Sequence, residues 1–223
     1  MQDEAQTIGR CPADGKDVDA TYLDVLVESL SHRNPSVRQD AAIALGNLGA
    51  KAEAAVRDLA KCYTDRATHV RRCVASALGK IGVRNDFVVE ALRDLLRDEE
   101  AVVQVQAAKA LWKITGETDE TVPVLAEGAT HSDVLVRYAA VTTLCDMGPA
   151  VQPAVEHLMV AAIDQDQGVS RAAVKALEQC GSRVREAEPL LEWLIDDDDP
   201  VVRETVRRIL AQIRQPPQSL GTQ

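Results

Sequence analysis

The chain repeats itself every 33 residues, and this period limits the possible folds more than any other feature of the sequence. Every step of 33 from Val37 reaches a valine, and the position eight residues after each valine is a leucine. These leucines are Leu45, Leu78, Leu111, Leu144, Leu177 and Leu210. A second leucine series, 22 residues after each valine, is Leu59, Leu92, Leu125, Leu158 and Leu191, with Leu26 one period earlier. A period held this long without insertion indicates an array of similar structural units.

Each repeat has the pattern of two amphipathic helices, here named A and B. Apolar residues at Val37, Ala41, Leu45 and Leu48 share one face of a helix with 3.6 residues per turn. Glycine follows this A helix in four of the six repeats, while Thr115 stands there in the third. Glycine suits a helix C-terminus because it tolerates a positive φ. The second apolar run predicts the B helix. Since one such hairpin cannot bury its own apolar faces, the repeats must stack.

We therefore predict an all-α fold, a right-handed α-solenoid of 33-residue helical hairpins with about five full units and a half unit at each end. A single solenoid domain is expected over residues 17–213, after a poorly ordered lead at 1–16 and before a flexible tail at 214–223. The expected elements are a B-type helix at about 18–31, hairpins at 34–65, 66–98, 99–131, 132–164 and 165–197, and a last A-type helix at about 200–213.

The segments VRQDAAIALGNLG at 37–49 and VRRCVASALGKIG at 70–82 resemble HEAT repeats, most closely those of the phycobilisome-lyase type. The resemblance covers about residues 18–213. It implies a scaffold or adaptor that binds proteins. It leaves two alternatives open, an accessory subunit of a bilin lyase or other chromophore-handling complex, and a nucleic-acid-associated HEAT protein. A hydroxylase branch of the superfamily uses His-Glu pairs as metal ligands, and here no histidine is followed by glutamate.

The charge balance narrows the choice of partners. Asp and Glu number 35 against 25 Lys and Arg, for a formal net charge of −10. Nucleic-acid binders usually carry a basic face, so nucleic acid and anionic membrane surfaces are not expected. No stretch is apolar enough to cross a bilayer, and the N-terminal residues do not resemble a secretory signal. The five cysteines are odd in number and form no CxxC pair, which favours reduced thiols and a cytoplasmic location.

No catalytic motif is present, so we predict a protein that is not an enzyme and has no catalytic, cofactor-binding or metal-binding residues. A small-molecule ligand is not expected. The acidic run at residues 196–199 lacks the spaced ligands and the glycine of a calcium loop, and a helix-capping role is expected instead.

A second periodic series joins opposite charges in the turns between repeats. Aspartates precede successive A helices, and arginines follow the repeat valines, which predicts helix caps and edge ion pairs. The aspartates are Asp65, Asp98, Asp164 and Asp197, and the arginines are Arg38, Arg71, Arg137 and Arg203. As exposed pairs they would each contribute only about 0–1 kcal/mol.

Solenoids bind partners along an extended, concave face, expected here to be lined by the B helices. The outward B-helix positions are charged in the N-terminal repeats and more apolar in the C-terminal ones. The candidate partner-binding residues are Arg57, Lys61, Glu90, Asp94, Val124, Glu127, His157, Val160, Leu190 and Trp193. Trp193 is a candidate anchor, since tryptophan is common at the centre of interfaces, unless it packs against the last helix. The expected partner is another protein or a peptide, and a basic one suits the acidity of the chain.

Overall fold

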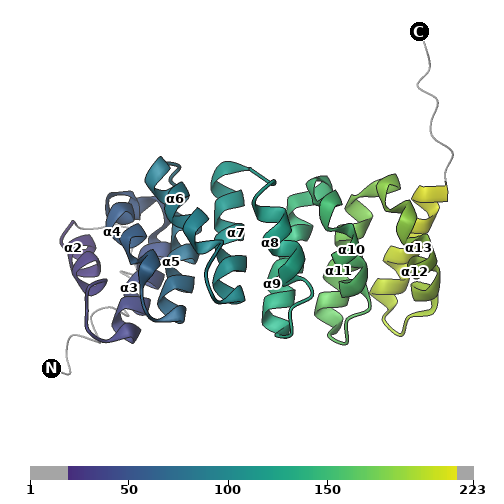
Figure 1. The fold of residues 1–223 in the computed structure, drawn as a ribbon, viewed down its shortest axis with the longest axis horizontal. Coiled ribbons are helices and arrows are strands. Elements are labelled where there is room, and N and C mark those ends of the chain that lie inside the picture. The colour runs from purple at the N-terminus through teal and green to yellow at the C-terminus, as the bar shows by residue number, and fades with distance from the viewer. Residues whose placement is uncertain (1–19, 215–223) are drawn as a thin grey trace, which may run out of the picture. The chain divides into compact units, whose positions relative to one another are not determined.

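The computed structural model describes residues 20–214, except the side chains at 20, 182 and 183. Between residues 20 and 214 the chain is helical and contains no strand (Figure 1), which confirms the predicted all-α fold. The predicted lead at 1–16 lies outside the described residues, as does the predicted tail beyond its first residue.

The described residues form two compact units, one ending at Glu117 and the other beginning at Thr118. The first unit contains α2 (Ala20–Ser29), α3 (Pro35–Leu48), α4 (Val56–Lys61), α5 (Thr68–Ile81), α6 (Asp86–Leu95) and α7 (Ala101–Thr115). The second contains α8 (Thr121–Gly128), α9 (Val134–Met147), α10 (Val155–Ala162), α11 (Gln167–Gln179), α12 (Glu188–Trp193) and α13 (Pro200–Arg214). Short 3₁₀ helices lead into α4, α10 and α12 at Gly49–Ala55, Gly148–Ala154 and Gly181–Ala187, and others follow at Cys62–Thr64 and Leu194–Asp196. A single domain over 17–213 stays a prediction.

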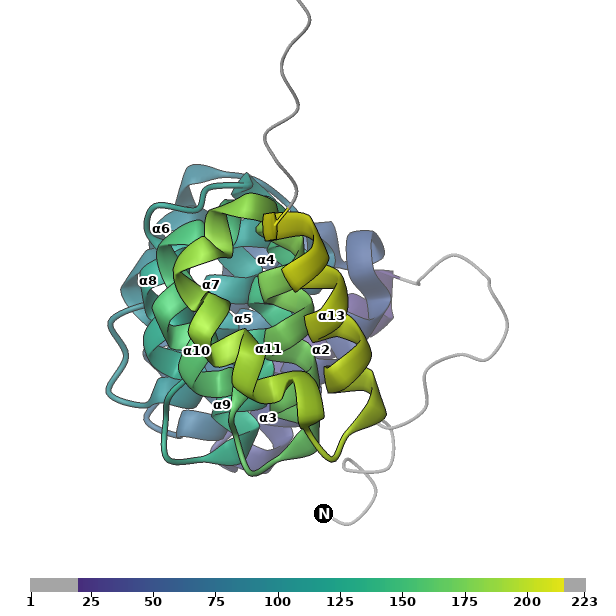
Figure 2. The same cartoon turned by 90° about the vertical axis from the view of Figure 1, so that its right-hand side faces the viewer.

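Within each unit the helices form two layers. The A helices α3, α5 and α7 lie side by side in the first unit, and α9, α11 and α13 do so in the second. The B helices α4 and α6, and likewise α8 and α10, form the other layer. Figure 2 shows this division in the second unit, with α8 and α10 on one side and α11 and α13 on the other. Each A helix therefore contacts the B helix that precedes it, and within a unit successive A helices contact one another.

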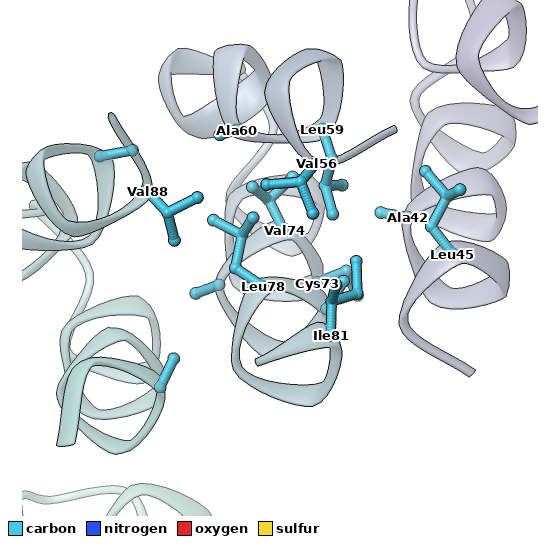
Figure 3. Packing of buried hydrophobic residues seen from close by; sticks show 14 of the residues in the cluster. Ala42, Leu45, Val56, Leu59, Ala60, Cys73, Val74, Leu78, Ile81 and Val88 are labelled. Carbon is cyan, nitrogen blue, oxygen red and sulfur yellow. The ribbon is translucent and has the colours of Figure 1, made fainter. Parts of the chain in front are cut away.

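The repeated leucines form the core. Five of the six A-helix leucines and all six of the second series are among the largest fully buried side chains of the described residues. Figure 3 shows the arrangement in the first unit, where Val56 and Leu59 of α4 lie over Val74 of α5. A buried leucine of this kind stabilises the fold by roughly 2–5 kcal/mol relative to alanine. The 33-residue period of the leucines therefore reflects which positions are buried.

Every A helix from α3 to α11 is followed by a glycine with positive φ, including the one in the third repeat. The residues are Gly49, Gly82, Gly116, Gly148 and Gly181, with φ between 58° and 76°. Aligned by the period, the third repeat has Thr115 at this position, and the sequence therefore suggested a missing glycine. The structure shows that α7 extends one residue further, so that Gly116 takes the left-handed conformation instead.

Two glycines inside A helices have a different role. They determine how closely neighbouring helices can approach each other. A Cβ atom placed on Gly46 of α3 would lie 2.9 Å from Cα of Ala77 on α5. A Cβ atom on Gly79 of α5 would lie 2.8 Å from Cβ of Ala110 on α7. Both distances are shorter than real Cβ contacts, so only glycine permits this approach of the two backbones.

We predict that Gly79→Ala destabilises the protein by about 1–3 kcal/mol, because the new methyl group overlaps Ala110. The direction of this stability change is informative, because replacing glycine by alanine at an uncrowded position inside a helix usually stabilises a protein by up to about 1 kcal/mol. Urea unfolding followed by circular dichroism measures the change. The double variant Gly79→Ala with Ala110→Gly should recover part of the loss, and a stabilised single variant would contradict the close approach.

Candidate interaction surface

Buried ion pairs join the turns between repeats and hold the B helices in position. Arg38, near the start of α3, donates from Nε to Oδ2 of Asp65 at 2.5 Å and from Nη2 to Oδ1 at 2.8 Å. Its Nη1 donates to the backbone oxygen of His32 at 2.8 Å. One guanidinium thus connects the turn before α3 with the turn that follows α4.

The same arrangement recurs in two further repeats. Arg71 binds Asp98 at 2.6 Å and the backbone oxygen of Asp65 at 2.9 Å. Arg137 binds Asp164 at 2.6 Å and the backbone oxygen of His131 at 2.9 Å. We call the three pairs Arg38–Asp65, Arg71–Asp98 and Arg137–Asp164 the Arg–Asp bridges.

The prediction that these pairs are exposed is wrong. The side chains of Arg38 and Asp65 are 8% and 9% exposed, and those of Arg71 and Asp98 are buried to the same degree. Each of these pairs is therefore shielded from water, and two hydrogen bonds join its guanidinium to the carboxylate. Loss of one partner would leave an uncompensated buried charge, which costs far more than loss of a surface pair.

The third and fifth repeats depart from the pattern in different ways. In the third repeat Gln104 replaces the arginine and keeps one bond, from Nε2 to the backbone oxygen of Asp98 at 2.5 Å. In the fifth, Ser170 occupies the arginine position and donates to the backbone oxygen of Ala162 at 2.8 Å. The next residue, Arg171, pairs with Asp199 at 2.5 Å. The fifth repeat therefore also has an Arg–Asp ion pair, but both of its residues lie later in the repeat than those of the Arg–Asp bridges.

The aspartates lie just before the following A helices, but most of them do not cap the helix as predicted. Oδ1 of Asp65 accepts a hydrogen bond from the amide of Ala67 at 2.9 Å, and Asp98 and Asp164 make the equivalent contact two residues on, in each case to the residue before the helix. In the acidic run, Asp197 accepts from the amide of Asp199, and Asp199 accepts from that of Val201 in the first turn of α13. Asp199 therefore has the predicted capping role.

The outward B-helix positions of the first unit carry charges that contact one another. Lys61 and Asp58 form an exposed pair at 2.8 Å on α4. The guanidinium of Arg57 lies over the ring of Phe87 at 5.9 Å, a cation–π distance. Asp94 on α6 accepts a hydrogen bond from the Tyr63 hydroxyl, which raises the Tyr63 pKa. The candidate residues Arg57, Lys61, Glu90 and Asp94 are all exposed.

The corresponding surface of the second unit is apolar. Trp193, at the end of α12, is 69% exposed, and Val160, one period earlier on α10, is 56% exposed. The alternative that Trp193 packs against the last helix is therefore wrong. Glu127, a further period earlier on α8, is exposed, while Val124, His157 and Leu190 are half-buried. Nδ1 of His157 is buried without a hydrogen-bond partner among the described residues.

Sequence reasoning missed one residue of this surface. Ile163 follows α10 and is 50% exposed, one turn beyond Val160. It lies past the last predicted outward position of the B helix, although its spacing of three from Val160 could have indicated it. We call Ile163 and the six candidate residues of the second unit the B-helix surface, namely Val124, Glu127, His157, Val160, Leu190 and Trp193.

The sequence family follows from this repeat structure. The family model for HEAT repeats matches residues 23–111, 89–163 and 155–220, which together exceed half of the chain. The chain belongs to the HEAT repeat family. No curated protein matches it.

Several solved structures similar to this HEAT repeat chain are of engineered or designed proteins. An engineered protein of the Northeast Structural Genomics Consortium is 24% identical with a TM-score of 0.65, over 86% of this chain and 96% of the other. A second from the same consortium is 26% identical with a TM-score of 0.64, over 88% and 99%. A designed armadillo repeat protein in complex with the peptide (KR)4 is 19% identical with a TM-score of 0.64, over 86% and 99%. These likenesses support the repeat-solenoid fold.

The side chains with catalytic potential are constrained by burial. Cys62, Cys73 and Cys145 are free thiols. Burial raises the pKa of the Cys62, Cys73 and Cys145 thiols, which keeps them protonated and weakly nucleophilic at neutral pH.

Over residues 20–214, no group of three or more His, Cys, Asp or Glu side chains is arranged to hold a metal ion. None of the helices in that range has the length and apolar character needed to cross a bilayer.

We predict that Asp65→Asn lowers the free energy of unfolding by about 3 kcal/mol, because it removes the charge that compensates buried Arg38. The matched control is Asp58→Asn, which breaks the exposed pair with Lys61 and should change stability by less than about 1 kcal/mol. Chemical unfolding of both variants at neutral pH makes the comparison. Equal losses would show that burial does not strengthen the Arg–Asp bridges.

The same bridges predict an acid dependence of stability. Burial alone raises the pKa of Asp65 and Asp164, but hydrogen bonds from the arginine and a backbone amide outweigh it and hold both pKa values below the ordinary 3.8. A carboxyl with a lowered folded pKa stabilises fully above its unfolded pKa and loses this effect as the pH falls through the folded value. The stability difference between wild type and Asp65→Asn should thus be constant near pH 7 and shrink below 3.8. Unfolding curves measured across this range test it, and a difference that grows on acidification would contradict it.

Proposed function

We propose that this HEAT repeat chain is a non-catalytic scaffold or adaptor whose B-helix surface holds a segment of another protein. The observation that carries the proposal is the exposure of Trp193 and Val160 at equivalent positions of consecutive B helices. Large apolar side chains that stay accessible to water on a folded surface are typical of protein interfaces. Tryptophan is also over-represented among the residues that dominate binding energy.

The charge around this apolar stripe defines the partner more closely. The helices α8, α10 and α12 contain no lysine and no arginine, but they carry glutamates, of which Glu127, Glu156 and Glu192 are exposed. Glu188 and Glu192 are paired with Arg214. An apolar stripe with acidic neighbours suits a segment that presents both apolar and basic side chains, because opposite charges favour correct docking.

A designed armadillo repeat protein of similar fold supplies a precedent, since its structure contains a bound (KR)4 peptide. This likeness supports a basic peptide as the partner of the B-helix surface. The phycobilisome-lyase type of repeat, the bilin-handling and nucleic-acid-associated roles, and the cytoplasmic location stay predictions.

The test selects peptides of about twelve residues from a random displayed library on the purified chain and measures their affinity by fluorescence anisotropy. We expect the selected peptides to combine aromatic or aliphatic anchors with Lys or Arg. Trp193→Ala should weaken their binding at least about tenfold, or about 1.4 kcal/mol, because it removes the most exposed anchor on these helices.

The matched control is Leu135→Ala, which removes an apolar side chain that is 72% exposed, against 69% for Trp193, from A helix α9 of the same unit. It should leave affinity within about twofold. Peptides that bind equally well to wild type and Trp193→Ala, or a selection that yields no binder below about 100 μM, would overturn the proposal.

A further inference from the structure

A basic cleft lies in the A-helix layer of the first unit. It is formed between α5 and α7 and has a volume of about 210 Å³. Its walls carry three ammonium groups, one amide and one hydroxyl, from Lys80, Lys109, Lys113, Gln106 and Ser76. We call this the lysine cleft. Every one of these groups can donate a hydrogen bond.

The floor of the lysine cleft comes from the close approach of the two helices. Gly79 and Ala110 line it, and the glycine has no side chain at all. Because neither residue extends beyond a methyl group, a ligand atom can approach the backbone between the lysines. The glycine that lets α5 and α7 pack closely thus also forms the base of the cleft.

The lysines of the cleft lack acidic partners. Lys109 and Lys113 form no ion pair with any described residue, and Lys80 donates only to Oδ1 of Asn47, at 3.2 Å. The 14 residues of α5 and the 15 residues of α7 include no Asp or Glu. Glu117, just after α7, contacts Arg84 and Arg93. A local excess of positive charge therefore persists in a chain whose net charge is −10.

Helix stabilisation explains only part of this arrangement. Lys80 and Lys113 lie in the last turns of α5 and α7, where a cation interacts favourably with the helix dipole. Lys109 lies one turn earlier in α7 and has no such role. Its position brings a second ammonium onto the face of α7 that already carries Lys113.

We infer that the lysine cleft is a docking site for an acidic peptide segment, one with clustered Asp and Glu side chains. Charge complementarity carries the inference, since three ammonium groups without acidic partners surround a cleft large enough for carboxylate side chains. A long polyanion such as nucleic acid would extend past three lysines onto the surface of a strongly acidic chain. A short acidic segment confines its charge to the cleft.

The test uses a fluorescein-labelled peptide of about eight glutamates, titrated with the full chain at about 25 mM and about 150 mM salt. Anisotropy should report binding that weakens as salt rises. The triple variant Lys80→Gln, Lys109→Gln, Lys113→Gln should weaken the affinity at least about tenfold. Replacing the same residues by arginine should preserve it within about threefold, because the charges remain.

The matched control removes three other lysines, as Lys51→Gln, Lys61→Gln, Lys175→Gln. All three are exposed, none lines the cleft, and the change in net charge is identical. We expect the control to bind the peptide within about twofold of wild type. Equal weakening in both triple variants would show a general charge effect and overturn the inference, as would a peptide that fails to bind at low salt.

Single-stranded DNA of equal charge, titrated in parallel, tests the class of partner. Tighter binding of DNA than of the glutamate peptide, lost in the cleft variant, would overturn an acidic peptide as the occupant. Thermal unfolding of each variant confirms that the chain is folded. Trp193→Ala should leave glutamate-peptide binding unchanged, so that the lysine cleft and the B-helix surface are tested separately.

Discussion

The stacking of hairpins that cannot bury their own apolar faces is the constraint on which the rest of this structure depends. Each A helix packs against the B helix of the preceding repeat and, within a unit, against the neighbouring A helix, so no repeat has a complete core alone. The close approach at Gly46 and Gly79 follows from the same need, because a wider spacing would leave the apolar seam partly open. The Arg–Asp bridges then fix the turns, and with them the direction in which each B helix points.

Two layers of helices give this chain two surfaces of opposite character. In the second unit the B helices contain acidic and apolar residues and no basic ones. In the first unit the A helices α5 and α7 contain basic residues and no acidic ones. The two surfaces thus belong to different helix layers and to different units of the chain.

The period predicted the helices and the core well, because burial repeats with the sequence. The period could not predict the burial of the Arg–Asp bridges, because the spacing of charges shows which of them can meet but not how exposed they are. Arg38, for example, is buried and binds the backbone of the turn before α3. The role of Gly116 was missed because helix α7 is one residue longer than the alignment implies. The lysine cleft was not predicted because a binding face was expected on the B helices, although Lys80 and Lys113 on the A helices are one period apart.

The places where the period breaks are as informative as the places where it holds. Leu59, Leu92, Leu125, Leu158 and Leu191 are identical because each is buried in the same environment. Two residues after each of them the chain has Lys61, Asp94, Glu127, Val160 and Trp193, five different residues at one exposed position. Substitution at an exposed helix position changes stability little, so side chains there can differ from repeat to repeat without loss of the fold. In a repeat protein this freedom lets stability be maintained by the buried positions while the outward positions differ according to what they bind.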